Sequence, residues 1–194
     1  GAEPSIPEML PDWAMSLIND CGGLVMLHIP RKARLGDPAN QREMRELALR
    51  WPKARIVIAH LGRAYYLRNI VGQLDLLKGL PNLWWDFSMV NHWEVMAYAF
   101  KELGVDRILF GSDAPIVWAP GKSVEINHQY SYVTPYKWDL SIHDSAPRVQ
   151  YTSFMNEELR AMRKACESLG YGKSDILRIF NDNAQGLLAQ PVKL

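Results

Sequence analysis

The chain alternates short apolar runs with longer segments in which apolar residues recur every three or four positions. A short run predicts a buried strand, and a longer periodic segment predicts an amphipathic helix. The expected strands cover residues 24–29, 56–59, 83–87 and 108–110. The expected helices cover residues 6–20, 38–50, 65–78, 92–103, 153–169 and 175–188.

Helices and strands therefore alternate through the first 110 residues, in units of roughly 30 residues. This order predicts an α/β fold in which helices cover a parallel sheet. Polar residues that cap helix starts support the boundaries, because Ser5, Asp37, Asn91 and Ser153 each precede an expected helix.

Residues 115–150 break this alternation. The segment is rich in Pro, Tyr, Trp and Ser and has no clean periodicity. Long irregular segments in compact domains commonly serve as lids, binding loops or interface arms. We expect an aromatic-rich loop insertion here.

Composition excludes several classes of function. The chain has 194 residues and a net charge of +1, which gives no electrostatic case for nucleic acid or an anionic membrane surface. No apolar run approaches the ~20 residues of a membrane span, and the first residues lack the features of a secretory signal. Two cysteines far apart in sequence favour a reducing, cytoplasmic setting. A small molecule is the expected partner.

Three of the expected strands end in residues that can do chemistry. His28 and His60 each close an apolar run, and Asp113 follows a third. A single strand histidine is more commonly structural. However, equivalent strand ends of a parallel sheet meet at one face, so the three side chains can converge. Imidazole and carboxylate groups are ligands that Zn²⁺ or Mn²⁺ accepts.

Other polar residues near these strand ends have both a functional and a purely structural interpretation. Arg31 and Arg63 each follow a histidine by three positions and could hold a substrate carboxylate, or simply form a solvated basic loop. Asp86 ends another strand, where it could orient a ligand histidine or cap a loop. His128 and His143 fall in the irregular segment, where a surface position is favoured.

Nucleotide-binding motifs are not found. Gly172-Lys-Ser174 lacks the earlier glycine of a P-loop, and there is no Gly-x-Gly-x-x-Gly. A doubly wound nucleotide-binding domain, which has the same alternation, is therefore a minor alternative.

Taken in series, these segments resemble the last four strands and the final helix of the amidohydrolase superfamily, in the branch that includes aminocarboxymuconate-semialdehyde decarboxylase. The resemblance runs from about Ser5 to Leu188. It is carried by His28-Ile-Pro-Arg31, His60-Leu-Gly-Arg63, Trp85-Asp-Phe-Ser88, Gly111-Ser-Asp-Ala-Pro115 and residues 179–188.

The resemblance implies a (β/α)8 TIM barrel, of which residues 1–194 would supply about four βα units from the carboxyl-terminal half. It implies that His28 ligates a divalent metal, Zn²⁺ or Mn²⁺ with Zn²⁺ favoured. It also implies that His60 acts as general acid and base or joins the metal shell, and that Asp113 is both a metal ligand and a proton acceptor. The metal would lower the pKa of a bound water toward ~7.

The chain departs from that family in one respect. It has no His-x-His pair and no four strands before Leu24, whereas a complete barrel takes ~250 residues. We therefore expect weak metal binding by this chain alone, and pairing with a missing amino-terminal half or a homo-oligomer. The leading hypothesis is a metal-dependent hydrolase or decarboxylase of a small carboxylated or ring substrate. The alternative is a non-catalytic half-barrel that serves as a binding or assembly module.

Overall fold

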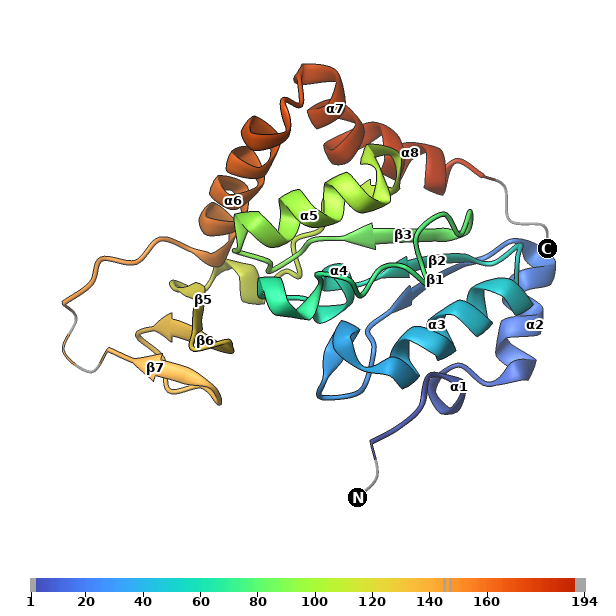
Figure 1. Cartoon of the computed structure of the whole chain (residues 1–194), viewed down its shortest axis with the longest axis horizontal. Helices are drawn as coiled ribbons and strands as arrows, with labels where there is room; N and C mark the ends of the chain where they lie inside the picture. Colours follow the sequence, from blue (N-terminus) through green and yellow to red (C-terminus); the bar gives the residue numbers. More distant parts are fainter. Residues whose placement is uncertain (1–2, 145, 147, 191–194) are drawn as a thin grey trace.

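A four-stranded parallel sheet forms the centre of the protein (Figure 1). The structure is a computed structural model that describes residues 3–144, 146 and 148–190. The strands pair in the order in which they occur along the chain, as the helix and strand alternation predicts. They are β1 (Leu24–Leu27), β2 (Arg55–Ile58), β3 (Leu83–Asp86) and β4 (Ile108–Leu109).

One face of this sheet, the outer face, carries the main hydrophobic core. Alternate strand residues such as Leu27, Ile56 and Trp85 are fully buried there. Side chains of four helices pack against the same face. These helices are α2 (Asp12–Cys21), α3 (Pro38–Arg50), α5 (Trp93–Leu103) and α6 (Phe154–Leu169). Apolar helix stripes facing an apolar sheet explain this part of the fold.

The opposite, inner face is only partly covered. Leu187 of α8 (Asn183–Leu188) packs against Val57 and Leu109. The Arg55 side chain holds α8 there, because it donates hydrogen bonds to the carbonyl groups of Leu187 and Gln190. Along β1 the inner-face residues are exposed, so the covering ends before the edge of the sheet.

The two edges of the sheet also differ. Beyond β4, the Phe110 N–H donates to the Ile179 carbonyl at 3.0 Å, so η5 (Arg178–Asp182) closes that side. Together α7 (Lys173–Leu177), η5 and α8 form the nearly continuous final helix that the sequence predicts. At the other edge, β1 has no second neighbour within the described residues.

The prediction of a single helix over residues 6–20 was wrong. The chain forms α1 (Ile6–Met9) and then α2, with a break at Leu10 and Pro11. Proline lacks an amide hydrogen and disfavours helical geometry in the residue before it, which accounts for the break. The predicted cap Ser5 is present, and it forms a capping box with Glu8 at the start of α1.

The helix expected over residues 65–78 was also wrong. Ile70, Leu74 and Leu77 are buried, so the periodicity marks a real apolar face. However, Gly72 and Gly79 adopt positive φ angles, and the backbone proceeds by successive turns instead. The elements preceding and within this stretch are α4 (His60–Arg63) and η2 (Leu67–Asn69).

Residues 115–150 are not an irregular loop throughout. They contain a second sheet of β5 (Lys122–Ile126), β6 (Gln129–Thr134) and β7 (Ser141–His143). Asn127 and His128, both with positive φ, form the two-residue turn that joins β5 to β6. Figure 1 shows this sheet on the side toward which the arrows of the first sheet point.

None of the described helices is both long and apolar enough to cross a membrane. Short 3₁₀ turns complete the fold. The turns are η1 (Arg34–Gly36), η3 (Val105–Arg107) and η4 (Ile116–Trp118).

Candidate active site

Two of the three predicted residues meet at the carboxyl end of the sheet. His28 follows β1 and His60 follows β2, and their ring centroids lie 5.3 Å apart in an edge-to-face arrangement. Asp113 follows β4, and it lies near enough for its charge to act on His28, where it partly offsets the lowered pKa of that imidazole. The structure therefore brings the two histidine rings together at the end of the parallel sheet, where α/β folds place their ligands, and the role of Asp113 at this site stays a prediction.

His60 is buried and held by a dense hydrogen-bond network. Its backbone N–H donates to Asp86 Oδ1 at 3.0 Å, and its ring Nδ1 lies 2.9 Å from both the carbonyl and the hydroxyl oxygen of Ser88. The Ser88 hydroxyl donates its own hydrogen to Asp86 at 2.6 Å. Because a carbonyl can only accept, this network assigns the proton to Nδ1. In the neutral form of the ring, the lone pair is then on Nε2.

The backbone around His60 is strained. All four residues of α4 have positive φ, from 49° at Leu61 to 68° at Gly62, so this segment is a left-handed turn. Such geometry costs about 1–2 kcal/mol for each residue other than glycine. Asp113 has a φ of 56° as well. Strained backbone of this kind concentrates at functional sites.

A glycine allows the sheet ends to approach closely. A Cβ atom at Gly111 would lie 3.3 Å from side-chain atoms of both Asp86 and Ser88. The backbone at Gly111, just after β4, thus lies directly against the residues that hold His60.

His28 differs from His60 in its surroundings. Its side chain reaches solvent on the open inner face, yet packing on its other side lowers the pKa of the imidazole. Electrostatic interactions with His60 and with the Arg63 guanidinium lower the pKa further, while that with Asp113 opposes them. His28 is therefore neutral near pH 7, which is the form that ligates a metal.

The two predicted substrate-binding arginines are engaged within the protein. Arg31 forms a two-point ion pair with Glu43, with nitrogen to oxygen distances of 2.6 and 2.8 Å. Nη1 of Arg63 donates to three consecutive carbonyl groups, those of residues 29–31, at 3.1–3.2 Å. Both side chains thus stabilise the loop that follows His28, and their role toward a substrate remains a prediction.

An aromatic contact joins the second sheet to the region around His60. Tyr65 lies 6.0 Å from the His60 ring and stacks on Tyr130 of β6 with centroids 4.5 Å apart. The Arg34 guanidinium lies over both tyrosine rings, at 5.3 and 4.8 Å. Sequence reasoning missed Arg34, Tyr65 and Tyr130, and the only available signal was the high aromatic content of residues 115–150.

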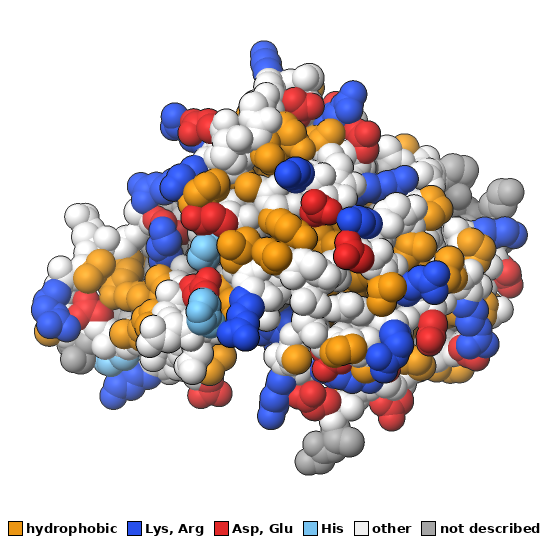
Figure 2. Space-filling view, in the orientation of Figure 1, with side chains coloured by type: hydrophobic (Ala, Val, Ile, Leu, Met, Phe, Trp, Pro, Cys, Tyr) orange, Lys and Arg blue, Asp and Glu red, His pale blue; other side chains and the backbone are white. Residues whose placement is uncertain are grey.

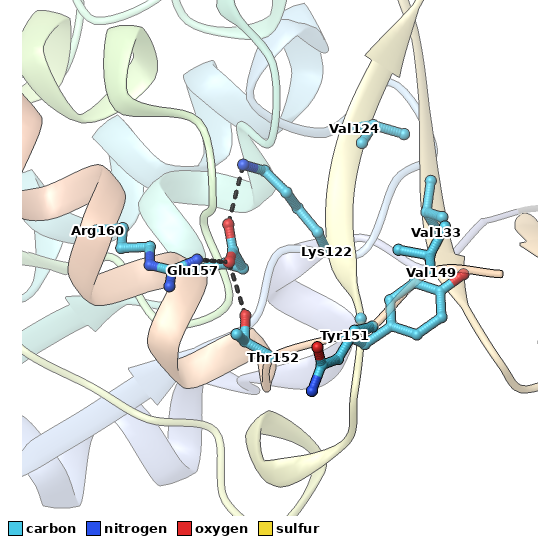
Figure 3. Close-up of a pocket in the computed structure, with 10 residues that line it drawn as sticks. Lys122, Val124, Val133, Val149, Tyr151, Thr152, Glu157 and Arg160 are labelled. Atoms are coloured by element: carbon cyan, nitrogen blue, oxygen red, sulfur yellow. Dashed lines mark hydrogen bonds and ion pairs between the residues drawn. The ribbon is translucent and has the colours of Figure 1, made fainter. Parts of the chain in front are cut away.

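A cavity of about 300 Å³ lies between β5, β6 and the start of α6 (Figure 3). Valine side chains form one wall. Opposite them, Glu157 accepts hydrogen bonds from Thr152 and Arg160 at 2.7 Å and pairs with Lys122 at 2.9 Å. None of the three residues predicted for chemistry lines this cavity. Its charged end instead fastens β5 to α6.

A shallow groove of about 500 Å³ contains the other notable histidines. His92 lies 3.0 Å from Glu94 and 3.6 Å from Glu125, and His128 lies 3.1 Å from the same Glu125. Figure 2 shows histidine side chains beside acidic ones on the face turned to the viewer. The surface position favoured for His128 agrees with its 66% side-chain exposure.

The side chains near His28 are chemically suitable metal ligands, but too few of the described ones lie together to hold a metal ion. Among the described residues, no three side chains of His, Cys, Asp or Glu come close enough together to hold a metal ion. His28 and Asp113 are suitable zinc ligands by chemistry. Within the described residues the set of donors is therefore too small to hold a metal ion, and the metal-ligand roles of His28 and Asp113 stay predictions.

Comparisons with known proteins show which family and fold this chain shares. A sequence profile of the amidohydrolase family matches residues 10–185. The comparison with curated proteins finds no match. An amidohydrolase from Burkholderia multivorans, solved with bound zinc, aligns with a TM-score of 0.60 at 13% identity, over 92% of this chain and 57% of that one.

Two further solved structures share the fold. Amidohydrolase 2 from Bifidobacterium longum subsp. infantis aligns with a TM-score of 0.57 at 16% identity, over 98% of this chain and 60% of that one. A 4-oxalomesaconate hydratase from Rhodopseudomonas palustris aligns with a TM-score of 0.54 at 16% identity, over 95% and 51%.

The chain thus spans between 51% and 60% of the length of these structures. Its parallel sheet and helices form part of their barrel fold, in agreement with the predicted TIM-barrel type. With most of its length matched by the family profile, the chain belongs to the amidohydrolase family.

Proposed function

We propose that this chain carries the acid–base histidine and part of the metal shell of a metal-dependent hydrolase or decarboxylase. The proposed substrate is a small carboxylated or ring compound. One observation carries the proposal: His60 is buried with its Nδ1 against Ser88, which leaves Nε2 for chemistry, and its ring lies 5.3 Å from that of His28.

His60 has the properties of a general base at Nε2. Its Nδ1–H is held by Ser88, and Asp86 fixes both Ser88 and the His60 backbone. A ring fixed in one orientation accepts or returns a proton without first reorganising. His28 and Asp113 are the residues that would hold a divalent metal, which supplies a nucleophilic hydroxide near neutral pH when bound.

We propose that the remaining donors come from a part of the barrel outside residues 1–194, or from a second chain. Within the described residues β1 has no second neighbour, so a further strand paired with β1 would lie close to His28. Both cysteines are free, which supports the cytoplasm as the proposed setting.

The first test is a zinc titration by calorimetry of the chain and of three variants. His28→Ala and Asp113→Asn are expected to weaken zinc binding by about tenfold or more, since even the partners of a metal ligand matter by 10–100-fold. His128→Ala is the matched control, because it removes a histidine from the surface groove. Zinc affinity that falls in His128→Ala and not in His28→Ala would contradict the proposal.

The second test adds an amino-terminal half-barrel from a family member together with zinc. Hydrolysis or loss of CO₂ is measured with a panel of carboxylated ring compounds. We expect turnover that disappears in His60→Ala. If neither zinc binding nor turnover is found with or without the added half, the chain is a non-catalytic assembly module.

A further inference from the structure

A glutamic acid on α6 is completely buried beside the candidate site. Glu158 has no exposed surface, and its Oε2 accepts a hydrogen bond of 2.7 Å from the backbone N–H of Met89. Its second oxygen, Oε1, has no hydrogen-bond partner among the described residues. Charged residue types are almost never fully buried without a partner, so this position calls for an explanation.

We infer that Glu158 is a positioning residue for His60, acting through the loop of residues 87–91. This inference rests on the proposed function only in the role that it gives to His60. The hydrogen bond to Met89 fixes the peptide next to Ser88, and Ser88 is the residue that holds the His60 ring.

The loop needs such a partner because its backbone is unusual. Met89 has a φ of 60°, a conformation that takes its N–H out of the regular pattern of a strand or helix. A buried N–H without a partner is costly, and the Glu158 carboxyl supplies the partner. An apolar residue at position 158 could not do so.

A second contact joins the same loop to the same helix. The Asn91 side chain donates to the Phe154 carbonyl at 3.2 Å and accepts from the Ser123 N–H at 2.9 Å. Asn91 is therefore not the helix cap expected from the sequence, since α5 begins after His92. The first turns of α6 thus hold the loop at two points, Met89 and Asn91.

The charge state of Glu158 fits this role. Burial, followed by the negative charges of Asp86 and Asp113, raises the pKa of the Glu158 carboxyl against the Met89 hydrogen bond, to about 9 in all. The group is therefore neutral near pH 7, where a carboxylate would be repelled by its acidic neighbours. A neutral carboxyl has the same shape as a glutamine amide.

The test compares Glu158→Gln with Glu158→Leu in the full chain. Nuclear magnetic resonance reports the tautomer and pKa of the His60 ring, and amide exchange reports on Met89. We expect Glu158→Gln to resemble the wild type. We expect Glu158→Leu to speed exchange at Met89 by about tenfold, as for one lost hydrogen bond, and to loosen the His60 tautomer toward a mixture.

Glu167→Leu is the matched control, because it makes the same change on the exposed face of α6. If Glu158→Leu does not fold, Glu158→Asp, which shortens the side chain by one methylene, takes its place with the same expectation. Unchanged His60 tautomer and Met89 exchange in a folded Leu or Asp variant would overturn the inference.

These readouts need neither zinc nor turnover. Failure of the zinc titration would therefore contradict the proposed function and leave the Glu158 result standing. Conversely, zinc binding at His28 together with an unchanged His60 in Glu158→Leu would contradict only the role of Glu158.

Discussion

The two faces of the four-stranded sheet differ sharply in how they are covered. On the outer face, Val25 and Leu27 of β1 are 7% and 1% exposed beneath helices. On the inner face of the same strand, Leu24 and Met26 are 37% and 62% exposed. Alternate residues of a single strand thus belong to a closed core and to an open surface.

The two faces also differ in what they contribute to the protein. The outer face has the buried apolar side chains that hold a domain together. The inner face leads to His28 at the carboxyl end of β1, and parallel strands are normally buried on both faces. The open surface and the proposed metal ligand His28 therefore occur together, at one edge of the sheet.

The largest expected effect sharpens the contrast between the faces. Trp85→Ala removes a fully buried outer-face side chain and should lower the free energy of unfolding by about 3–5 kcal/mol. Met26→Ala, on the open inner face, should change it by less than about 0.5 kcal/mol. Urea denaturation of both variants checks this, and equal losses would remove the distinction.

The covered part of the inner face depends on Arg55. Arg55→Ala leaves the carbonyl groups of Leu187 and Gln190 without their donor and should cost about 1.5–3 kcal/mol. Proteolysis should also begin to cut within α8. Resistance of α8 equal to that of the wild type would show that apolar packing alone holds this helix.

The left-handed turn α4 predicts a smaller effect on stability. Gly62→Ala places a Cβ atom 3.1 Å from the Leu35 side chain at a φ of 68°, and should cost about 1–2 kcal/mol. Gly186→Ala in α8, where nothing lies within 4 Å, is the control and should stabilise by about 0.5–1 kcal/mol. Thermal unfolding distinguishes the two, and a neutral Gly62→Ala would argue against the strained turn.

Glu158 predicts a dependence of stability on pH. Its pKa of about 9 in the folded protein exceeds the ordinary carboxyl value, so its contribution is complete below about pH 4.5 and is lost as the pH rises toward 9. Between these limits the loss approaches ~1.4 kcal/mol per pH unit. Glu158→Gln cannot titrate, so its stability should decline less steeply. Parallel pH profiles of the two proteins would refute the raised pKa.

Much of the scaffold could be predicted because each signal was local. The apolar runs at β1 to β4 and the caps Ser5, Asp37 and Ser153 correspond to observed strands and helix starts. The errors arose where a few backbone angles override periodicity. Residues 70–77 keep a helical apolar pattern, yet glycines with positive φ turn the chain instead.

The candidate site was predictable only in its strand-end residues. His28 and His60 follow directly from the pattern of the strands, and the structure brings their rings together. Glu158 could not be found in this way, since its spacing on α6 resembles that of any helix residue. Its importance depends on a contact with Met89, 69 positions earlier in the sequence.

The most direct test of the account is the behaviour of the histidine rings when zinc is added. Long-range ¹H–¹⁵N spectra report each ring nitrogen of this protein separately. The account predicts that His60 carries its proton on Nδ1 before zinc is added, and that the signals of His28 move first as zinc binds. Signals of His92 and His128 that shift while His28 stays unchanged would place the metal in the surface groove and contradict the account.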